Sequence, residues 1–371
     1  MLALRDAGCN VAAGEVLAKM NWMRVAIVVL LCGCAAPTPP AAAPTTKPAE
    51  AATPKPAAES LDSLYAAAKS EGQMALYGTL NTQFAQPLID KFSARYPGVK
   101  VNYNRQQAEK LSAIMQQEAA AGNMSWDVLD GPEDMFVLWA NNKYVQAYTS
   151  PSASSFPNEL KDPAGMWVSD RVNPQSLVVN TDLVKADELP TTWTDMVDPR
   201  WKGRLAIDDT NVLLYVAMKD HWGAQKATDY LRGIAANQPR LEASNATIAQ
   251  LLGAGEFGVA AGIYTDAPHA MQQQGAPVKI IGADPVFVQL QLLGLGAKGA
   301  HPNAGKLYIS WLLGDDGQTA LNEVGVVPAR PDKYQLATAF IGAKNTVIIS
   351  PAQAAKAPES TAEFNQILGI K

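Results

Sequence analysis

The sequence predicts an α/β fold with two doubly wound lobes. From Leu61 onward, short apolar segments such as 73–78 and 204–208 alternate with longer segments of helical periodicity such as 82–98 and 212–223. Strands separated by helices indicate parallel sheets with helices on both faces. The chain has 371 residues, and a single hydrophobic core stops growing at about 250–300 residues. We therefore expect two lobes.

The individual elements follow from their periodicity. Phe84, Leu88 and Phe92 recur every four residues and predict one apolar helix face, whereas Val99 and Val101 alternate with polar residues as in a half-buried strand. The expected elements, in chain order, are segments 60–72, 73–78, 82–98, 99–104, 108–122, 126–131, 176–180, 191–197, 204–208, 212–223, 226–236, 257–264, 267–275, 277–281, 286–297 and 302–314.

The N-terminal segment resembles a lipoprotein signal. Arg24 precedes the apolar run Val25–Leu31, which ends in Cys-Gly-Cys and predicts Cys34 as the lipidated residue. The alternative, a transmembrane anchor, needs about 20 apolar residues, and this run is much shorter. We assign 1–34 to an upstream segment and signal peptide. The Pro- and Ala-rich segment 35–59 is expected to be a disordered tether, because it has too little apolar surface to order itself.

Composition and motifs argue against several classes of function. The net charge of −5 provides no basic field for nucleic acid. All three cysteines precede residue 35, which excludes disulfides and thiolate chemistry from the folded part. The match to GxGxxG at 294–299 is interpreted as a turn, because Pro302 suits the first turn of a following helix. No GxSxG or paired-histidine metal motif occurs.

Four junctions between a strand and a following helix are candidates for a binding cleft. They are the segments 77–83, 129–135, 207–213 and 262–269. Ligands of open α/β sheets bind at the carboxyl ends of strands, and helix starts offer unpaired N–H groups. The alternative for each junction is ordinary helix capping by its Asp, Thr or Asn residues. Four such junctions together favour a shared cleft.

Several ordered segments resemble the extracytoplasmic solute-binding proteins of ABC importers. The resemblance spans about Leu61–Pro331 and is most specific in "TTWTDMVDPRWKGRLAIDD" and "HPNAGKLYISWLLG". It is strongest to the type II periplasmic binding proteins that capture ferric iron, aminoethylphosphonate and related solutes. It implies two lobes joined by crossover strands, here near Leu177–Asn180 and Val286–Leu292. We therefore assign 60–178 plus 287–371 to lobe one and 179–286 to lobe two.

The resemblance implies an extracytoplasmic, membrane-anchored monomer that binds a small polar or anionic solute between its lobes without converting it. Its partners would be the solute, an ABC permease with its ATPase, and the membrane through the lipid, but no nucleic acid. No cofactor or resident metal is expected. The candidate ligand-binding residues are Thr79, Asn81, Gly131, Pro132, Glu133, Asp208, Thr210, Asn211, Tyr264, Thr265 and Asp266.

Two alternatives remain open at this point. Ferric binders of the family use neighbouring tyrosines, whereas Tyr264 here is followed by Thr265 and Asp266. If ferric iron is the transported ligand, Tyr264, Asp266 and Glu133 are the candidate metal ligands, a small set for a hard cation. The second alternative is an enzyme on a binding-protein scaffold, related to thiamine-precursor proteins, for which no nucleophile and base motif is visible.

Overall fold

The computed structural model describes residues 60–330 and 345–370 of the chain. The predicted signal peptide, Cys34 and tether lie outside the described residues. Within the described ranges, no helix is long and apolar enough to cross a bilayer.

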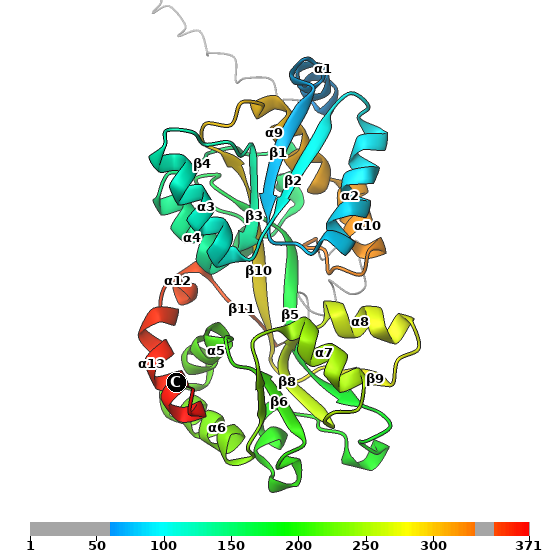
Figure 1. Ribbon diagram of the computed structural model, residues 1–371, viewed down its shortest axis with the longest axis vertical. Coiled ribbons are helices and arrows are strands. Elements are labelled where there is room, and N and C mark those ends of the chain that lie inside the picture. The colour runs from blue at the N-terminus through cyan, green and yellow to red at the C-terminus, as the bar shows by residue number, and fades with distance from the viewer. Residues whose placement is uncertain (1–59, 331–344, 371) are drawn as a thin grey trace, which may run out of the picture. The chain divides into compact units, whose positions relative to one another are not determined.

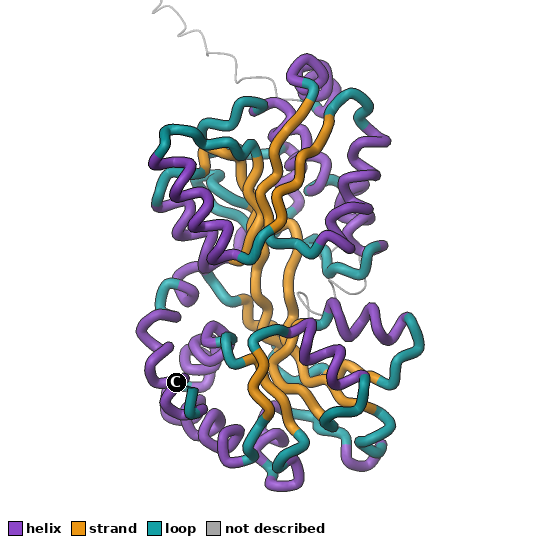
Figure 2. Tube along the Cα trace, in the orientation of Figure 1, coloured by secondary structure: helices purple, strands orange, loops and turns teal. Residues whose placement is uncertain are grey.

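The described residues form a mixed α/β structure built on a sheet of eleven strands (Figure 2). The strands are β1 (Gln73–Gly78), β2 (Lys100–Arg105), β3 (Val128–Pro132), β4 (Val145–Gln146), β5 (Val168–Asn180), β6 (Leu205–Asp208), β7 (Arg240–Glu242), β8 (Val259–Tyr264), β9 (Val278–Ile281), β10 (Val286–Gly296) and β11 (Thr346–Ile348). The α/β fold class predicted from the sequence is therefore confirmed.

Helices surround the two ends of this sheet. The α-helices are α1 (Leu61–Glu71), α2 (Thr82–Arg95), α3 (Ala108–Ala120), α4 (Glu133–Asn141), α5 (Val212–Trp222), α6 (Ala224–Ala236), α7 (Asn245–Gly253), α8 (Asp266–Gln273), α9 (Pro302–Leu312), α10 (Asp315–Glu323), α12 (Pro351–Ala354) and α13 (Ala357–Leu368). The short 3₁₀ helices are η1 (Pro151–Ser155), η2 (Asn158–Leu160), η3 (Ala186–Glu188), η4 (Trp193–Val197) and η5 (Pro199–Trp201).

Strand order explains how the two halves are joined. The main path of the sheet is β2-β1-β3-β10-β5-β8-β6-β7. The outer groups β2-β1-β3 and β8-β6-β7 are parallel, as the alternation of strands and helices predicts. The expectation of purely parallel pairing is wrong for the centre, where β10 runs antiparallel to β3 and to β5, and β5 runs antiparallel to β8. The predicted crossover positions lie in β5 and β10 (Figure 1).

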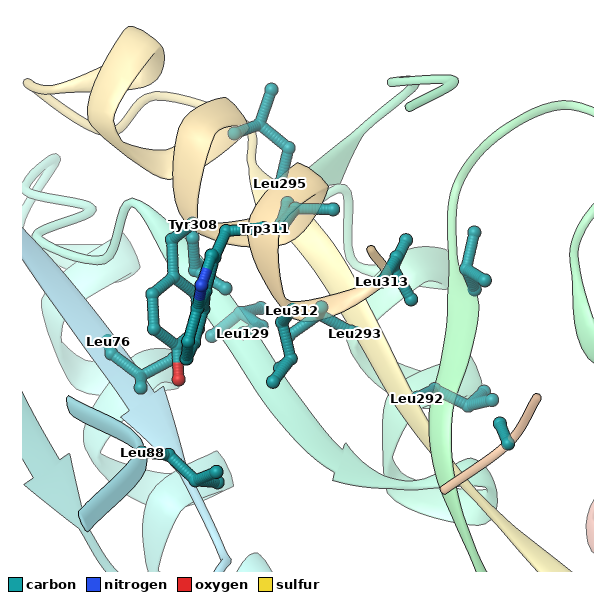
Figure 3. Packing of buried hydrophobic residues seen from close by; sticks show 14 of the residues in the cluster. Leu76, Leu88, Leu129, Leu292, Leu293, Leu295, Tyr308, Trp311, Leu312 and Leu313 are labelled. Atoms are coloured by element: carbon teal, nitrogen blue, oxygen red, sulfur yellow. The ribbon is translucent and has the colours of Figure 1, made fainter. Parts of the chain in front are cut away.

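Two large groups of buried apolar residues form most of the core, and both include residues of β5 and β10. In the first, Phe84, Leu88 and Phe92 of α2 are all buried, which confirms the predicted helix face. Phe92 contacts Tyr308 and Trp311 of α9, with ring centroids 5.1 and 5.4 Å apart. Figure 3 shows both α9 side chains among the leucines of this group. Each fully buried side chain of this size contributes about 1.5–3 kcal/mol.

The second large group includes residues of β6, α5, α6 and the C-terminal helix α13. Phe364 of α13 is buried, and its ring contacts that of Tyr215 of α5, with the centroids 6.0 Å apart and the rings tilted by 45°. The sequence assigns 287–371 as a whole to lobe one, but α13 packs against α5 and α6, within 179–286. The lobe boundaries themselves stay a prediction.

A buried carboxylate connects the first strands to α9. Asp127 is 1% exposed and accepts hydrogen bonds from Ala75 N at 2.7 Å and from His301 N and Nδ1 at 2.7 and 2.9 Å. A Cβ on Gly299 would lie 2.4 Å from Asp127 Oδ1. Gly299 thus permits a close turn around this carboxylate, and α9 begins at Pro302 as predicted.

We expect the substitution Asp127→Asn to destabilise the protein. An amide N–H₂ would replace one acceptor oxygen and face N–H donors in a buried site, which costs about 1–3 kcal/mol of unfolding free energy. Urea unfolding monitored by circular dichroism measures the loss. Asp187→Asn, at an exposed position, is the control and is expected to change stability by less than about 0.5 kcal/mol. Equal midpoints for both variants would contradict this role of Asp127.

Candidate functional site

A cavity of about 370 Å³ opens where the ends of several strands meet. Its size lies within the range of small-molecule binding pockets. Thr79 follows β1, Arg105 ends β2, Asp208 ends β6 and Tyr264 ends β8, so the carboxyl ends of strands from both outer groups supply its wall. Arg171 of β5 also lines it, together with Gln291 of β10. This is the location expected for a ligand in an open α/β sheet.

Helix N-termini also meet at this cavity. Asn81 precedes α2, Gln107 precedes α3 and Ser244 precedes α7, while Asp266 is the first residue of α8, and all four line the wall. The first N–H groups of a helix lack partners within it and, with the helix dipole, favour negative charge. The backbone thus makes the cavity attractive to an anion or to a strongly polar group.

Hydrogen bonds connect three of these elements into one rigid wall. Asp208 Oδ1 accepts from Thr210 N and Oγ1 at 2.9 and 2.6 Å. Asp208 Oδ2 accepts from Asn245 Nδ2 at 2.6 Å, and Asn245 Oδ1 in turn accepts from Tyr264 N at 2.9 Å. Burial raises the pKa of Asp208, while its bonds to Thr210 and Asn245 lower it in part. Since donors already surround Asp208, its charge is well compensated.

Tyr264 and Asp266 add a hydroxyl and a carboxyl group to the same wall, and burial favours the protonated, neutral form of each. The Tyr264 hydroxyl donates to Gln289 Oε1 of β10. Burial raises the pKa of Tyr264 well above its ordinary value, and the nearby carboxyl groups of Glu133 and Asp208 raise it further. Tyr264 is therefore a protonated donor at neutral pH. Burial also raises the pKa of Asp266, although Arg171 acts in the opposite direction.

Arg105 is the cation of the cavity with the most unused donor capacity. Its Nε is buried and has no hydrogen-bond partner, whereas Arg171 Nη1 already donates to both Asp130 and Asp170. A guanidinium cannot lose its proton in a protein, so it remains a charged donor at any physiological pH. A carboxylate or phosphate group is the natural complement for such a donor.

The structure brings most of the predicted binding residues together. Those that line the cavity are Thr79, Asn81, Pro132, Asp208, Thr210, Tyr264 and Asp266. Their role as ligand contacts stays a prediction.

Four predicted residues lie elsewhere. Gly131 packs against Trp139, and a Cβ added at Gly131 would lie 2.6 Å from the Trp139 ring. Asn211 caps α5 through Leu214 N and donates to Gln175 Oε1 at 2.6 Å, as the capping alternative expects. Thr265 lines a separate cavity beside α8. Glu133 is fully buried at the start of α4 and does not line the main cavity.

Sequence reasoning missed several cavity residues. Arg105 and Gln107 stand at the junction between β2 and α3, to which the same rule about strand ends applies, so the signal was present. Asn245 follows β7, which has only three residues and no readable periodicity. Asn173 and Gln291 belong to the central strands β5 and β10, where a buried strand has no alternation of polar and apolar residues.

Of the three candidate ferric ligands, Tyr264 and Asp266 line the cavity and Glu133 does not. Within the described ranges, no three His, Cys, Asp or Glu side chains are grouped closely enough to hold a metal ion. For a ferric site, Tyr264 would have to lose the proton that it donates to Gln289, and Glu133 would have to leave its buried position.

Comparisons with known proteins find a matching family and several relatives. A family model described as "Bacterial extracellular solute-binding protein" matches residues 128–347. The "Fe(3+)-binding periplasmic protein" of Serratia marcescens is 21% identical over 265 residues, which cover 69% of this chain and 78% of the relative.

Two solved structures have the same fold. Iron-bound HitA from Pseudomonas aeruginosa has a TM-score of 0.67 at 19% identity, covering 80% of this chain and 99% of that one. The periplasmic binding protein AfuA from Actinobacillus pleuropneumoniae, with fructose-6-phosphate bound, has a TM-score of 0.71 at 19% identity, covering 81% and 100%. The type II periplasmic binding protein fold predicted from the sequence is confirmed.

The buried Glu133 predicts a measurable pH dependence of stability. Its side chain is fully buried, and this burial raises the pKa of Glu133 well above its ordinary value, against the smaller lowering effect of the backbone N–H groups of Glu133 and Leu290. Between the ordinary and the raised value, unfolding lets Glu133 release its proton. The unfolding free energy therefore falls as pH rises through that interval.

We expect Glu133→Gln to remove this part of the pH dependence, because a neutral amide does not ionise. Urea midpoints measured from about pH 5 to pH 7.5 should fall less steeply in the variant than in the wild type. The exposed Glu159→Gln serves as the control and should retain the wild-type slope. A variant with an unchanged slope would show that Glu133 is ionised in the folded protein.

Proposed function

The chain belongs to the bacterial extracellular solute-binding proteins, and on this premise we propose that it captures a small anionic organic solute for import by an ABC transporter. The solute would occupy the cavity of about 370 Å³ at the strand ends. This volume suits a molecule that carries one acidic group and a short polar body.

Arg105 carries the argument for an anionic solute. Its buried Nε lacks a partner, and a buried donor without a partner costs free energy that a bound acceptor would recover. The starts of α2, α3, α7 and α8 surround the same space and favour negative charge there. Three carboxyl groups, those of Glu109, Asp208 and Asp266, also line the cavity. Burial raises the pKa of Asp208 and of Asp266, which favours their neutral forms, and Glu109 is exposed to solvent, which screens its charge.

Neutral polar groups support a solute that also bears hydroxyl or amine groups. Thr79, Asn81, Asn173 and Gln291 line the cavity and offer both donors and acceptors. Tyr264 offers a hydroxyl or an aromatic face. Buried sites that hydrogen-bond a particular hydroxyl group discriminate strongly against solutes that lack it.

Membership of the family supports binding without chemical conversion. The Serratia marcescens relative and AfuA are both named as binding proteins. We propose that the two lobes close around the solute by bending of β5 and β10, because contacts to both lobes form only when they approach. A monomer with its solute enclosed would then dock on the ABC permease, and the partner ATPase would drive import.

The location proposed for the protein is extracytoplasmic. Membrane anchoring would use lipid on Cys34, with 35–59 as the tether to the binding domain. Each buried methylene of an acyl chain contributes about 0.8 kcal/mol, so two or more chains hold a domain at the membrane stably.

Native mass spectrometry of the purified protein, followed by calorimetric titration, tests the class of solute. The probes are inorganic phosphate, fructose 6-phosphate, aminoethylphosphonate, citrate and ferric citrate. We expect binding of at least one metal-free organic anion at micromolar concentration, equivalent to about −8 kcal/mol. Binding of ferric citrate alone, with a tyrosinate-to-iron absorption band that Tyr264→Phe abolishes, would instead support the ferric alternative.

We expect Arg105→Gln to weaken binding of the organic anion identified in this way. Loss of one charge-assisted hydrogen bond costs about 1.5–3 kcal/mol, or roughly tenfold to a hundredfold in affinity. Arg232→Gln is the matched control, because Arg232 lies on the exposed surface of α6 and pairs only weakly with Asp229 at 3.6 Å. Equal affinities of the two variants would argue against Arg105 as the anion contact.

A further inference from the structure

A buried cluster of three charged residues borders the cavity. Arg171 of β5 is 3% exposed, and its Nη1 donates to Asp130 Oδ1 at 2.7 Å and to Asp170 Oδ2 at 2.9 Å. Asp130 belongs to β3, and Asp170 precedes Arg171 on β5. We call these three residues the hinge ion cluster, because β5 is one of the two central strands between the outer groups.

The hinge ion cluster has one more negative group than positive groups. Two carboxyl groups share one guanidinium, and a buried charge without a partner is costly. The neighbouring polar groups do not correct the imbalance. Gln291 of β10 is uncharged and contacts Arg171 Nη2 at 3.4 Å. The phenols of Tyr103 on β2 and Tyr308 on α9 are neutral, because burial raises the pKa of both well above the ordinary value.

Two further neighbours of Asp170 donate hydrogen bonds to its backbone carbonyl and not to its carboxyl group. Gln318 Nε2 of α10 donates to the Asp170 carbonyl oxygen at 2.9 Å, and Asp170 O also accepts from Ala329 N at 3.1 Å. The nearby Arg330 directs its guanidinium to Asp315, at 2.5 Å. Arg171 and Asp130 are thus the charged partners on which the protonation of Asp170 depends.

Asp170 is the member of the hinge ion cluster that can take up a proton near neutral pH. Burial is the largest influence and, together with Asp130, raises the pKa of Asp170 to about 7, although Arg171 acts to lower it. This raised pKa favours protonation of Asp170, so its charge is sensitive to any new charge beside Arg171.

Part of Arg171 is available to a ligand in the cavity. It lines the cavity wall, and its Nη2 makes only the long contact with Gln291. Arg105 lies on the same wall, and both guanidiniums lower the pKa of Tyr103 against the larger effect of burial. An anion bound at Arg105 therefore lies within the field of Arg171.

We propose that Arg171 is a second anion contact of the cavity and that anion binding favours the protonated form of Asp170, with the proton taken up from solvent. This inference rests on the proposed function, since it needs an anion in the cavity. A bound anion joins Asp130 and Asp170 as a third negative group, against the two guanidiniums of Arg105 and Arg171. Protonation of the Asp170 carboxylate restores the balance and leaves the pair of Arg171 with Asp130. Asp170 thus acts as a positioning residue through Arg171.

The sign of the pH effect follows from linkage. A bound anion raises the pKa of Asp170 further, so the complex binds more protons than the free protein at and above neutral pH. Affinity is therefore level below the pKa of the free protein and falls as pH rises above it. An increase of one unit in the pKa corresponds to about a tenfold difference in affinity.

Inorganic sulfate is the test probe, because its charge does not change between about pH 6 and pH 9. Amide chemical shifts of residues at the cavity, including Asn81 and Gln107, report its binding to the wild-type protein. We expect the dissociation constant to rise by up to about tenfold across this range. Calorimetry at about pH 8 in buffers of different ionisation enthalpy should show uptake of a fraction of a proton per sulfate.

The substitution Asp170→Asn separates this mechanism from a general effect of pH. The variant keeps the pair of Arg171 with Asp130 and cannot ionise at position 170. We expect it to bind sulfate with less than about a twofold change across the same range. Asp90→Asn, at an exposed position of α2, is the control and should keep the wild-type dependence. If Asp170→Asn fails to fold, the absence of proton uptake by the wild type on sulfate binding would still reject the inference.

The outcomes distinguish this inference from the proposed function. Sulfate binding that is independent of pH in the wild type, without proton uptake, would overturn the role of Asp170 and leave the cavity as an anion site. A cavity that binds neither sulfate nor the organic anions would overturn both. Equal pH dependence in Asp170→Asn and in the wild type would assign the titration to another group and also reject the inference.

Discussion

The antiparallel pairing of β5 with β10 is the constraint on which the rest of the structure depends. These two strands connect the two outer groups of the sheet, because β10 also pairs with β3 of one group and β5 also pairs with β8 of the other. Their backbone groups must therefore stay paired along the whole passage. Both strands are buried almost throughout, so every polar side chain that they direct toward the cavity needs an internal partner.

This constraint accounts for the chemistry of the cavity wall. Arg171 on β5 is compensated by Asp130 and Asp170, and Gln289 on β10 accepts from Tyr264 of the opposite group. A strand on the surface could leave such groups to water, whereas a central strand cannot. The residues best placed to sense a solute are thus also those that maintain the connection between the two halves.

The sequence is informative where periodicity is strong. The face of α2 with Phe84, Leu88 and Phe92 could be predicted, as could the start of α9 at Pro302. The antiparallel direction of β10 could not, because an apolar run carries no information on the direction of its neighbours. Arg105 could have been found from its junction after β2. The hinge ion cluster could not, since Asp130 and Arg171 are 41 residues apart and meet only through strand pairing.

The passage between the halves has a third segment besides the central pair. β11 runs parallel to β10 from Thr346 to Ile348, and the chain then continues into α12 and α13, which pack on α5. Two paired strands alone could twist about the strand direction as easily as they could bend out of the plane of the sheet. A third strand beside them stiffens the sheet against torsion and leaves flexing as the softer mode. For the closure proposed above, β11 would therefore favour flexing over torsion as the way in which the two halves approach each other.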